Sequence, residues 1–243
     1  MAKVHPNAVS PPEPGTPGGA TGVADRAAAE GDEPPTVLTV WRKSLLFNCD
    51  GFTVFDASGD LAFRVDCYAG SRRRRRRADD VVLMDARGKP LLTIRRKTRL
   101  GLAERCWVIY DGDADAAEQG PNDRATPLLY VRRHVGRLGS NSACKTLARV
   151  ATPGAEASGA AYVVEGSYGR RTCAVRDAAR GGAVVAEVQR KEAVGDDVFR
   201  LVVAGPQLGA PLAMALVIAL DDMFRGGAGG WSARSLLHRT LSV

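Results

Sequence analysis

The sequence lacks the features of a disulfide-stapled or zinc-binding protein. Its five cysteines are an odd number, they are scattered along the chain, and no two of them form a CxxC pair. A disulfide framework needs an even set of cysteines, and a structural zinc site needs closely spaced ligands. We therefore expect reduced thiols, as in proteins of the cytosol or nucleus.

Residues suited to catalysis are also scarce. The three histidines are His5, His134 and His238, and no two of them are placed as partners for metal binding or acid–base work. No serine or cysteine has neighbours that would activate it as a nucleophile. We expect a protein without enzyme activity, cofactor or metal.

The sequence also lacks the usual signals for membrane targeting and the long apolar run of a membrane-spanning helix. The first residues, Met1–Pro6, contain no apolar signal-peptide core, and Ala2 in place of glycine excludes N-myristoylation. The uncharged apolar stretch Leu208–Leu220 is 13 residues long, short of the roughly 20 needed to cross a bilayer. We expect no transmembrane span and a location on the cytosolic side.

Positive charge is concentrated in one place. The chain has 34 basic and 27 acidic residues, for a net charge of +7, but without one run the remaining 28 basic and 27 acidic residues nearly balance. That unbroken run consists of Arg72, Arg73, Arg74, Arg75, Arg76 and Arg77. Any argument for an anionic partner must begin from this segment, which we expect to be the loop joining strand 61–67 to strand 80–85.

Composition divides the chain into three parts. Residues 1–35 hold seven of the 13 prolines with few large apolar side chains, which predicts a disordered tail. Residues 226–243 begin with a glycine-rich linker and predict a flexible C-terminal tail. The folded domain is expected between them, over residues 36–225.

Within this domain, apolar and polar residues alternate with the period of β-strands. Leu61, Phe63 and Val65 share one side of a predicted strand, and about a dozen such runs follow one another. Three turns share one sequence pattern, in which aspartate begins the turn and glycine provides the residue with positive φ. They are Asp56–Gly59, Asp85–Gly88 and Asp177–Gly181.

One segment, 207–224, predicts a helix that is apolar on every face. Such a helix must be buried. Its small residues, among them Ala213, Ala215 and Ala219, would allow close approach to surrounding walls. The combination predicts a mainly β protein, in which a closed antiparallel barrel of about 12 strands surrounds a buried hydrophobic C-terminal helix.

Several blocks of the sequence resemble the plant LURP-one-related family, over about residues 36–225. The blocks are Trp41–Val54, Val82–Lys97, Val164–Tyr168, Arg190–Val194, Asp197–Val203 and Ala213–Ile218. The resemblance implies a tubby-like fold, shared with tubby domains and phospholipid scramblases, and no established enzyme activity. It also implies a link to basal defence, and tubby relatives bind phosphoinositides at the plasma membrane and can act as membrane-tethered transcription regulators. The arginine run and the acidic stretch 111–123 depart from the family pattern.

The arginine run has two interpretations. It contacts an anionic lipid or phosphoinositide, or it is a solvated loop without a ligand. Nuclear import would use the same charges, whereas nucleic-acid binding is disfavoured because no aromatic residues are interleaved. A second basic patch would arise if strand residues alternate onto one outer face. Its members would be Arg95, Arg96, Lys97 and Arg99.

Two segments resemble ligand-binding motifs but lack residues that those motifs require. Gly139–Thr146 has Walker A spacing, but Cys144 replaces the second glycine and its β-carbon would obstruct the phosphate cradle. Asp111, Asp113 and Asp115 resemble the start of a calcium loop, but Ala116 and Asn122 occupy positions that need glycine and glutamate. We expect neither nucleotide nor calcium binding from them.

These observations lead to one functional hypothesis and two alternatives. The hypothesis is a non-enzymatic tubby-like module of stress or defence signalling that docks reversibly to anionic lipids, phosphoinositides or an unknown protein partner. One alternative is a scramblase-like lipid-handling protein, and the other is a nuclear regulator with the arginine run as import signal. The expected location is the cytoplasm, with the plasma-membrane surface or the nucleus as further sites.

Overall fold

The computed structural model describes residues 34–45, 51–66, 80–98, 105–114, 125–134, 146–155, 159–191, 195 and 197–225. They all belong to one compact unit, Asp32–Val243. The tails expected at 1–35 and 226–243 lie outside the described residues except for Pro34 and Pro35, so the domain boundaries stay predictions.

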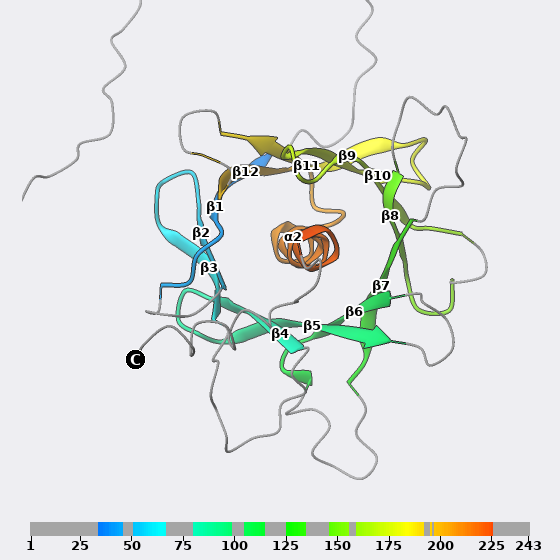
Figure 1. The fold of residues 1–243 in the computed structure, drawn as a ribbon, viewed down its shortest axis with the longest axis horizontal. Coiled ribbons are helices and arrows are strands. Elements are labelled where there is room, and N and C mark those ends of the chain that lie inside the picture. The colour runs from blue at the N-terminus through cyan, green and yellow to red at the C-terminus, as the bar shows by residue number, and fades with distance from the viewer. Residues whose placement is uncertain are drawn as a thin grey trace, which may run out of the picture. The chain divides into compact units, whose positions relative to one another are not determined.

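Twelve antiparallel strands form a closed barrel, which confirms the predicted fold class (Figure 1). Each strand pairs with its neighbours in sequence, and β1 pairs with β12 to close the ring. The strands are β1 (Thr36–Trp41), β2 (Gly51–Phe55), β3 (Leu61–Asp66), β4 (Asp80–Asp85), β5 (Pro90–Thr98), β6 (Arg105–Asp111), β7 (Pro127–Arg133), β8 (Thr146–Ala151), β9 (Tyr162–Ser167), β10 (Thr172–Asp177), β11 (Ala183–Arg190) and β12 (Val198–Val203).

The period-2 pattern of the sequence sets which side chains face inward. In β1, Leu38 and Val40 are buried while Trp41 is 45% exposed. In β12, Phe199, Leu201 and Val203 are all buried and Arg200 is exposed. Because adjacent residues of a strand point to opposite faces, every strand contributes an apolar row to the interior.

The three aspartate turns form as expected. The Asp56 carboxylate accepts hydrogen bonds from the backbone N–H groups of Ser58 and Asp60, both at 2.9 Å. In the turn between β4 and β5, the Asp85 carboxylate accepts the equivalent pair of bonds, and Asp177 accepts one at 2.9 Å from the Ala179 N–H. The glycines of these turns have positive φ, which a β-carbon would oppose. These aspartates are therefore turn residues.

The helix α2 (Ala210–Arg225) runs inside the barrel (Figure 1). It begins three residues later than residue 207, where the sequence pattern placed its start. Gly209 has a φ of +69°, which is not helical, and its carbonyl accepts the first bond of the helix, from the Ala213 N–H at 3.0 Å. Pro211 lies in the first turn, where its missing N–H costs no helical hydrogen bond.

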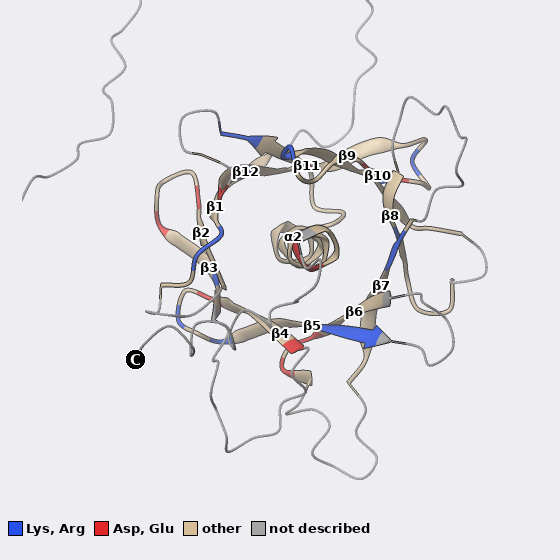
Figure 2. Ribbon diagram, in the orientation of Figure 1, with Lys and Arg blue, Asp and Glu red and all other residues tan. Residues whose placement is uncertain are grey.

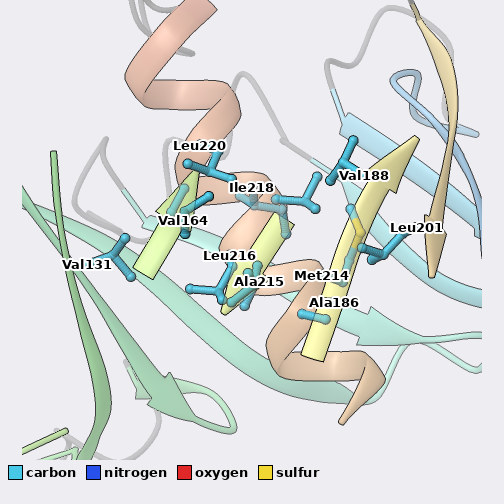
Figure 3. Close-up of a cluster of buried hydrophobic side chains, with 14 of the residues drawn as sticks. Val131, Val164, Ala186, Val188, Leu201, Met214, Ala215, Leu216, Ile218 and Leu220 are labelled. Atoms are coloured by element: carbon cyan, nitrogen blue, oxygen red, sulfur yellow. The ribbon is translucent and has the colours of Figure 1, made fainter. Parts of the chain in front are cut away.

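Side chains of α2 fill the interior and contact the inward rows of the strands. Met214, Leu216, Ile218 and Leu220 are each at most 1% exposed. Figure 3 shows them among residues of the surrounding strands, namely Val131, Val164, Ala186, Val188 and Leu201. Three alanines of the helix, Ala213, Ala215 and Ala219, are buried as well, so small residues set the distance between helix and wall.

We expect that Ile218→Asp prevents folding, because it places an unpaired carboxylate where a side chain is 1% exposed. The variant would lose roughly 2–3 kcal/mol of apolar burial and also bear the larger cost of a buried charge. Circular dichroism and urea unfolding measure this. Val184→Asp is the matched control, since Val184 is 40% exposed. A melting curve of Ile218→Asp equal to that of the control would exclude a buried α2.

Candidate functional site

The helix α2 ends at one rim of the barrel, where β1, β5 and β7 end and β6, β10 and β12 begin. We call this end the C-terminal rim. It is identified by contacts of Asp221, Asp222 and Phe224 with residues of those strands and of the β9–β10 turn. Most of the charged contacts to the helix lie here.

Asp221 is the buried centre of this rim. Its side chain is 1% exposed. One carboxylate oxygen, Oδ2, accepts a hydrogen bond from Arg42 Nε at 2.8 Å. The other, Oδ1, accepts one from the Tyr168 hydroxyl at 3.2 Å and lies 3.8 Å from Nη2 of Arg171. Three residues from two distant parts of the barrel wall thus converge on one helical carboxylate.

Arg171 is held in a costly position to reach this carboxylate. It is fully buried, and its φ of +56° lies in the left-handed region, which costs a non-glycine residue about 1–2 kcal/mol. The guanidinium carbon lies 4.4 Å from the ring centroid of Tyr168 and 4.2 Å from that of Phe199. Stacking on two rings and pairing with Asp221 offset the burial of its charge.

Asp222 makes a second set of contacts. Its Oδ2 accepts a hydrogen bond from the indole Nε1 of Trp107 at 2.8 Å and lies 3.5 Å from Nη1 of Arg96. Two residues on, the ring of Phe224 lies under the Arg133 guanidinium at 5.0 Å. The last turn of α2 is therefore fixed to β6, β5 and β7 by polar contacts.

The electrostatics of the rim follow from the direction of the helix. Two aspartates in the last turn oppose the helix dipole, whose negative end lies there, at a cost of about 0.3–1 kcal/mol each. Burial by itself would lower the pKa of Arg42, but the charge of Asp221 and the hydrogen bond to it raise that pKa above its usual value. Burial, then the charge of Asp221, raises the pKa of Tyr168. Both groups therefore stay protonated and donate to Asp221.

This arrangement is suited to holding the helix rather than to catalysis. Arginine does not release its proton near neutral pH, and the raised pKa of Tyr168 removes it from acid–base work in the same range. Within the described ranges, no group of three or more histidine, cysteine, aspartate or glutamate residues is placed to hold a metal ion. The rim is a set of buried ion pairs and hydrogen bonds that fix α2 to the barrel wall.

The structure separates the basic residues of β5 that the sequence grouped together. Arg95 is 2% exposed, pairs with Asp80 at 2.9 Å and stacks on Tyr110. Arg96 points to the interior and Asp222, whereas Lys97 is exposed on the outer face. Arg72, Arg73, Arg74, Arg75, Arg76, Arg77 and Arg99 lie outside the described residues. Lipid binding by any of these residues stays a prediction.

The acidic stretch is described only in part. The Ala114 N–H donates to Thr93 Oγ1 at 3.1 Å, and Thr93 donates to the Gly112 carbonyl at 2.8 Å. Buried Ala114 packs with Val108 and Tyr110 in a small apolar cluster on the outside of β6. Residues 115–124, which hold the rest of the calcium-like pattern, lie outside the described residues, as does 139–145 of the Walker-like segment.

The two cysteines within the described chain, Cys106 and Cys173, are free thiols. Burial raises the pKa of Cys173 to about 12, so this thiol stays protonated and unreactive near neutral pH. Cys49, Cys67 and Cys144 lie outside the described residues, so the reduced state of the full set stays a prediction.

Sequence reasoning missed the residues that build the rim. Asp221 and Asp222 served only as the end of an apolar run. Arg42 and Tyr168 lay in blocks that carried the family resemblance without an assigned role, and Arg171 lay in none. One signal was present: two adjacent aspartates in the last turn of a helix expected to be buried require cationic partners. The sequence could not say which of its many arginines supplies them.

We expect Asp221→Asn to lower the free energy of unfolding by about 3–5 kcal/mol, because it leaves buried Arg171 without its counter-charge. Asp222→Asn is the matched control, since its neighbour Arg96 is partly exposed and can reach water. It should cost about 1–2 kcal/mol. Urea unfolding compares the two. Equal losses would show that Asp221 is no more important to the fold than Asp222.

Comparisons with known proteins agree with this architecture. The family model described as LURP-one-related matches residues 36–221. Protein LURP-one-related 8 of Arabidopsis thaliana is 41% identical over 93% of this chain and 99% of its own length, and LURP-one-related 17 of the same plant is 37% identical over 82% and 87%. An X-ray structure of another Arabidopsis thaliana protein, at 22% identity, has the same fold with a TM-score of 0.52 over 78% of this chain and 91% of its own. The chain is a member of the LURP-one-related family.

Proposed function

We propose that this protein is a non-enzymatic module of plant stress or defence signalling that docks reversibly to anionic lipids at a membrane surface. The observation that carries the proposal is the run Arg72–Arg77, six consecutive positive charges in one inter-strand segment. Basic residues near an anionic leaflet contribute about 1 kcal/mol each. Six would give a dissociation constant of roughly tens of micromolar, which suits reversible docking.

The position of the arginine-bearing segment supports the proposal. Its described flanks, Asp66 at the end of β3 and Asp80 at the start of β4, lie at the C-terminal rim. Asp80 is bonded to Arg95, two residues before exposed Lys97. The segment therefore leaves and rejoins the barrel at the rim where exposed Lys97 lies, and the attraction of Lys97 to an anionic surface would add to that of the run.

The proposal assigns no catalytic role, and the packing of the barrel interior supports this. The helix α2 occupies the barrel, and its side chains pack against the inward rows of the strands. A ligand entering the barrel would have to displace α2 and separate Asp221 from Arg42 and Arg171. The outer surface is the face that remains for binding.

In the described part of the chain, no helix is long and apolar enough to cross a membrane; α2 has 16 residues. A scramblase-like role would require α2 to leave the barrel and enter lipid. Carbonate extraction of membrane-bound protein separates the two cases, because a docked module is released and an inserted helix is retained.

We expect the protein to sediment with vesicles that contain anionic lipid and not with neutral vesicles. Replacing all six arginines, Arg72–Arg77, with serine should remove most of this binding, and raising the salt from 50 to 150 mM should weaken it through screening. Replacement by six lysines is the matched control and should retain binding. No binding of the unaltered protein to any vesicle would overturn the proposal and direct attention to protein partners or nuclear import.

A further inference from the structure

Three large apolar side chains are open to solvent in the described part of the chain, and two of them lie close together. Trp41 is 45% exposed, Leu45 is 53% exposed and Val184 is 40% exposed. Trp41 is the last residue of β1 and Leu45 follows four residues later, so both are at the C-terminal rim. Val184 is near the start of β11, a strand that begins at the opposite rim. The C-terminal rim thus holds an exposed apolar pair, and Val184 lies apart from it.

The pair arises because the alternation of β1 continues beyond the end of the strand. Trp41, Lys43 and Leu45 are exposed. Between them, Arg42 is half-buried and Ser44 is buried. Because residues two apart in an extended chain project to the same side, an indole, an ammonium group and an isobutyl group follow one another along the outer side of the rim.

Hydrogen bonds hold this segment on both sides. The Arg42 N–H donates to the Asp197 carbonyl at 2.8 Å, next to β12, and its guanidinium is bonded to Asp221 at 2.8 Å. On the other side, the Lys43 carbonyl accepts a hydrogen bond from Thr53 Oγ1 of β2 at 2.7 Å. The exposed side chains therefore project from a backbone that is fixed to the barrel.

Positive charge accompanies the apolar pair at this rim. Lys43 lies between the two apolar residues, and exposed Lys97 lies near the end of β5. Arg170, in the turn between β9 and β10, is exposed as well. Figure 2 shows the basic segments that follow β1 and end β5. These cations add to those of the arginine run, whose segment joins β3 to β4 at the same rim.

The opposite rim is less suited to an anionic surface. Its charged turns within the described chain contain six acidic and three basic residues. They are 56–60, 85–89, 111–114 and 177–182. A negatively charged bilayer is therefore attracted less to that end of the barrel than to the C-terminal rim.

We propose that Trp41 and Leu45 insert into the headgroup region of an anionic bilayer, with Lys43 at the lipid phosphates between them. This inference rests on the proposed membrane docking and adds an apolar anchor to the arginine run. The two lie close together, because β1, β2 and β3 are neighbours and a strand spacing of about 4.8 Å puts β1 roughly 10 Å from β3. Stable attachment to a membrane takes an apolar contact in addition to a polybasic segment.

A bilayer suits this pair better than a protein partner does. A standard protein–protein interface buries about 800 Å² on each partner, and charged residues are depleted at its centre. Here exposed Lys43 separates the two apolar side chains. An indole ring is favoured at a membrane interface, where its apolar body and its N–H both find suitable surroundings. The alternation of apolar and cationic groups matches the level at which acyl chains and phosphates meet.

The first test compares full-length Leu45→Ser with Val184→Ser, which removes an exposed apolar side chain from the opposite rim. Leu45 is changed rather than Trp41 because the Trp41 ring packs against Phe55, with 5.5 Å between the ring centroids. Binding to vesicles of phosphatidylcholine and phosphatidylserine is measured by sedimentation. We expect Leu45→Ser to bind about tenfold more weakly and Val184→Ser to bind as the unaltered protein does. Both urea midpoints should stay near that of the unaltered protein, since both positions are exposed.

The second test detects insertion directly through tryptophan fluorescence. The chain has three tryptophans, Trp41, Trp107 and Trp231. Because Trp107 is 3% exposed, Trp231→Phe leaves Trp41 as the tryptophan that lipid can reach. We expect vesicles with brominated acyl chains to quench this variant, and Trp41→Phe in the same background to remove the quenching. Vesicle-bound protein without quenching refutes insertion.

The outcomes separate this inference from the docking on which it rests. If the unaltered protein binds vesicles, Leu45→Ser binds equally well and no quenching occurs, docking by the arginine run stands and the apolar anchor is refuted. If the unaltered protein binds no vesicles, both are wrong. Equal losses of binding in Leu45→Ser and Val184→Ser also refute the anchor. Self-association that Leu45→Ser abolishes, with vesicle binding unchanged, would assign the pair to contact with a second copy of the chain and refute the anchor too.

Discussion

The burial of α2 inside a closed sheet is the constraint on which the rest of this structure depends. The helix supplies the apolar interior that twelve half-buried strands need, and the strands cover a helix that has no polar face. The last turns of the helix contain Asp221, a charged residue that is buried inside the molecule. Arg42, Tyr168 and Arg171 meet that carboxylate, so the ends of strands far apart in the barrel are tied to one point.

This constraint also determines where function can lie. Because α2 packs inside the barrel and its end is fixed by polar contacts, the proposed docking uses the outer faces, the rims and the connecting segments. There the chain has distributed its charge unevenly. Strands β5 to β8 contain more basic than acidic residues, while the remaining strands together are slightly acidic.

Local patterns were enough to predict most of the architecture. Alternation fixed the inward rows, the aspartate–glycine turns formed as expected, and the all-round apolar helix is buried. The same patterns did not determine the environments of Arg95, Arg96 and Lys97. These neighbours have three different environments: a buried pair with Asp80, an inward pair with Asp222 and an exposed position. Alternation places Arg96 on the opposite face of β5 from Arg95 and Lys97. Only the register with β4 brings Asp80 next to Arg95, which is buried in this ion pair.

By itself, therefore, the sequence determined the fold class, the helix inside it, the turn residues and the family, because periodicity and turn chemistry are local properties. The tertiary structure alone decided which arginines meet Asp221 and which form a row on the outer wall. Lys97, Arg132 and Arg149 are 17 to 52 positions apart in the chain and become neighbours only through strand register. Strand register depends on contacts between segments that are distant in the sequence, and it is what brings these residues to the same outer face.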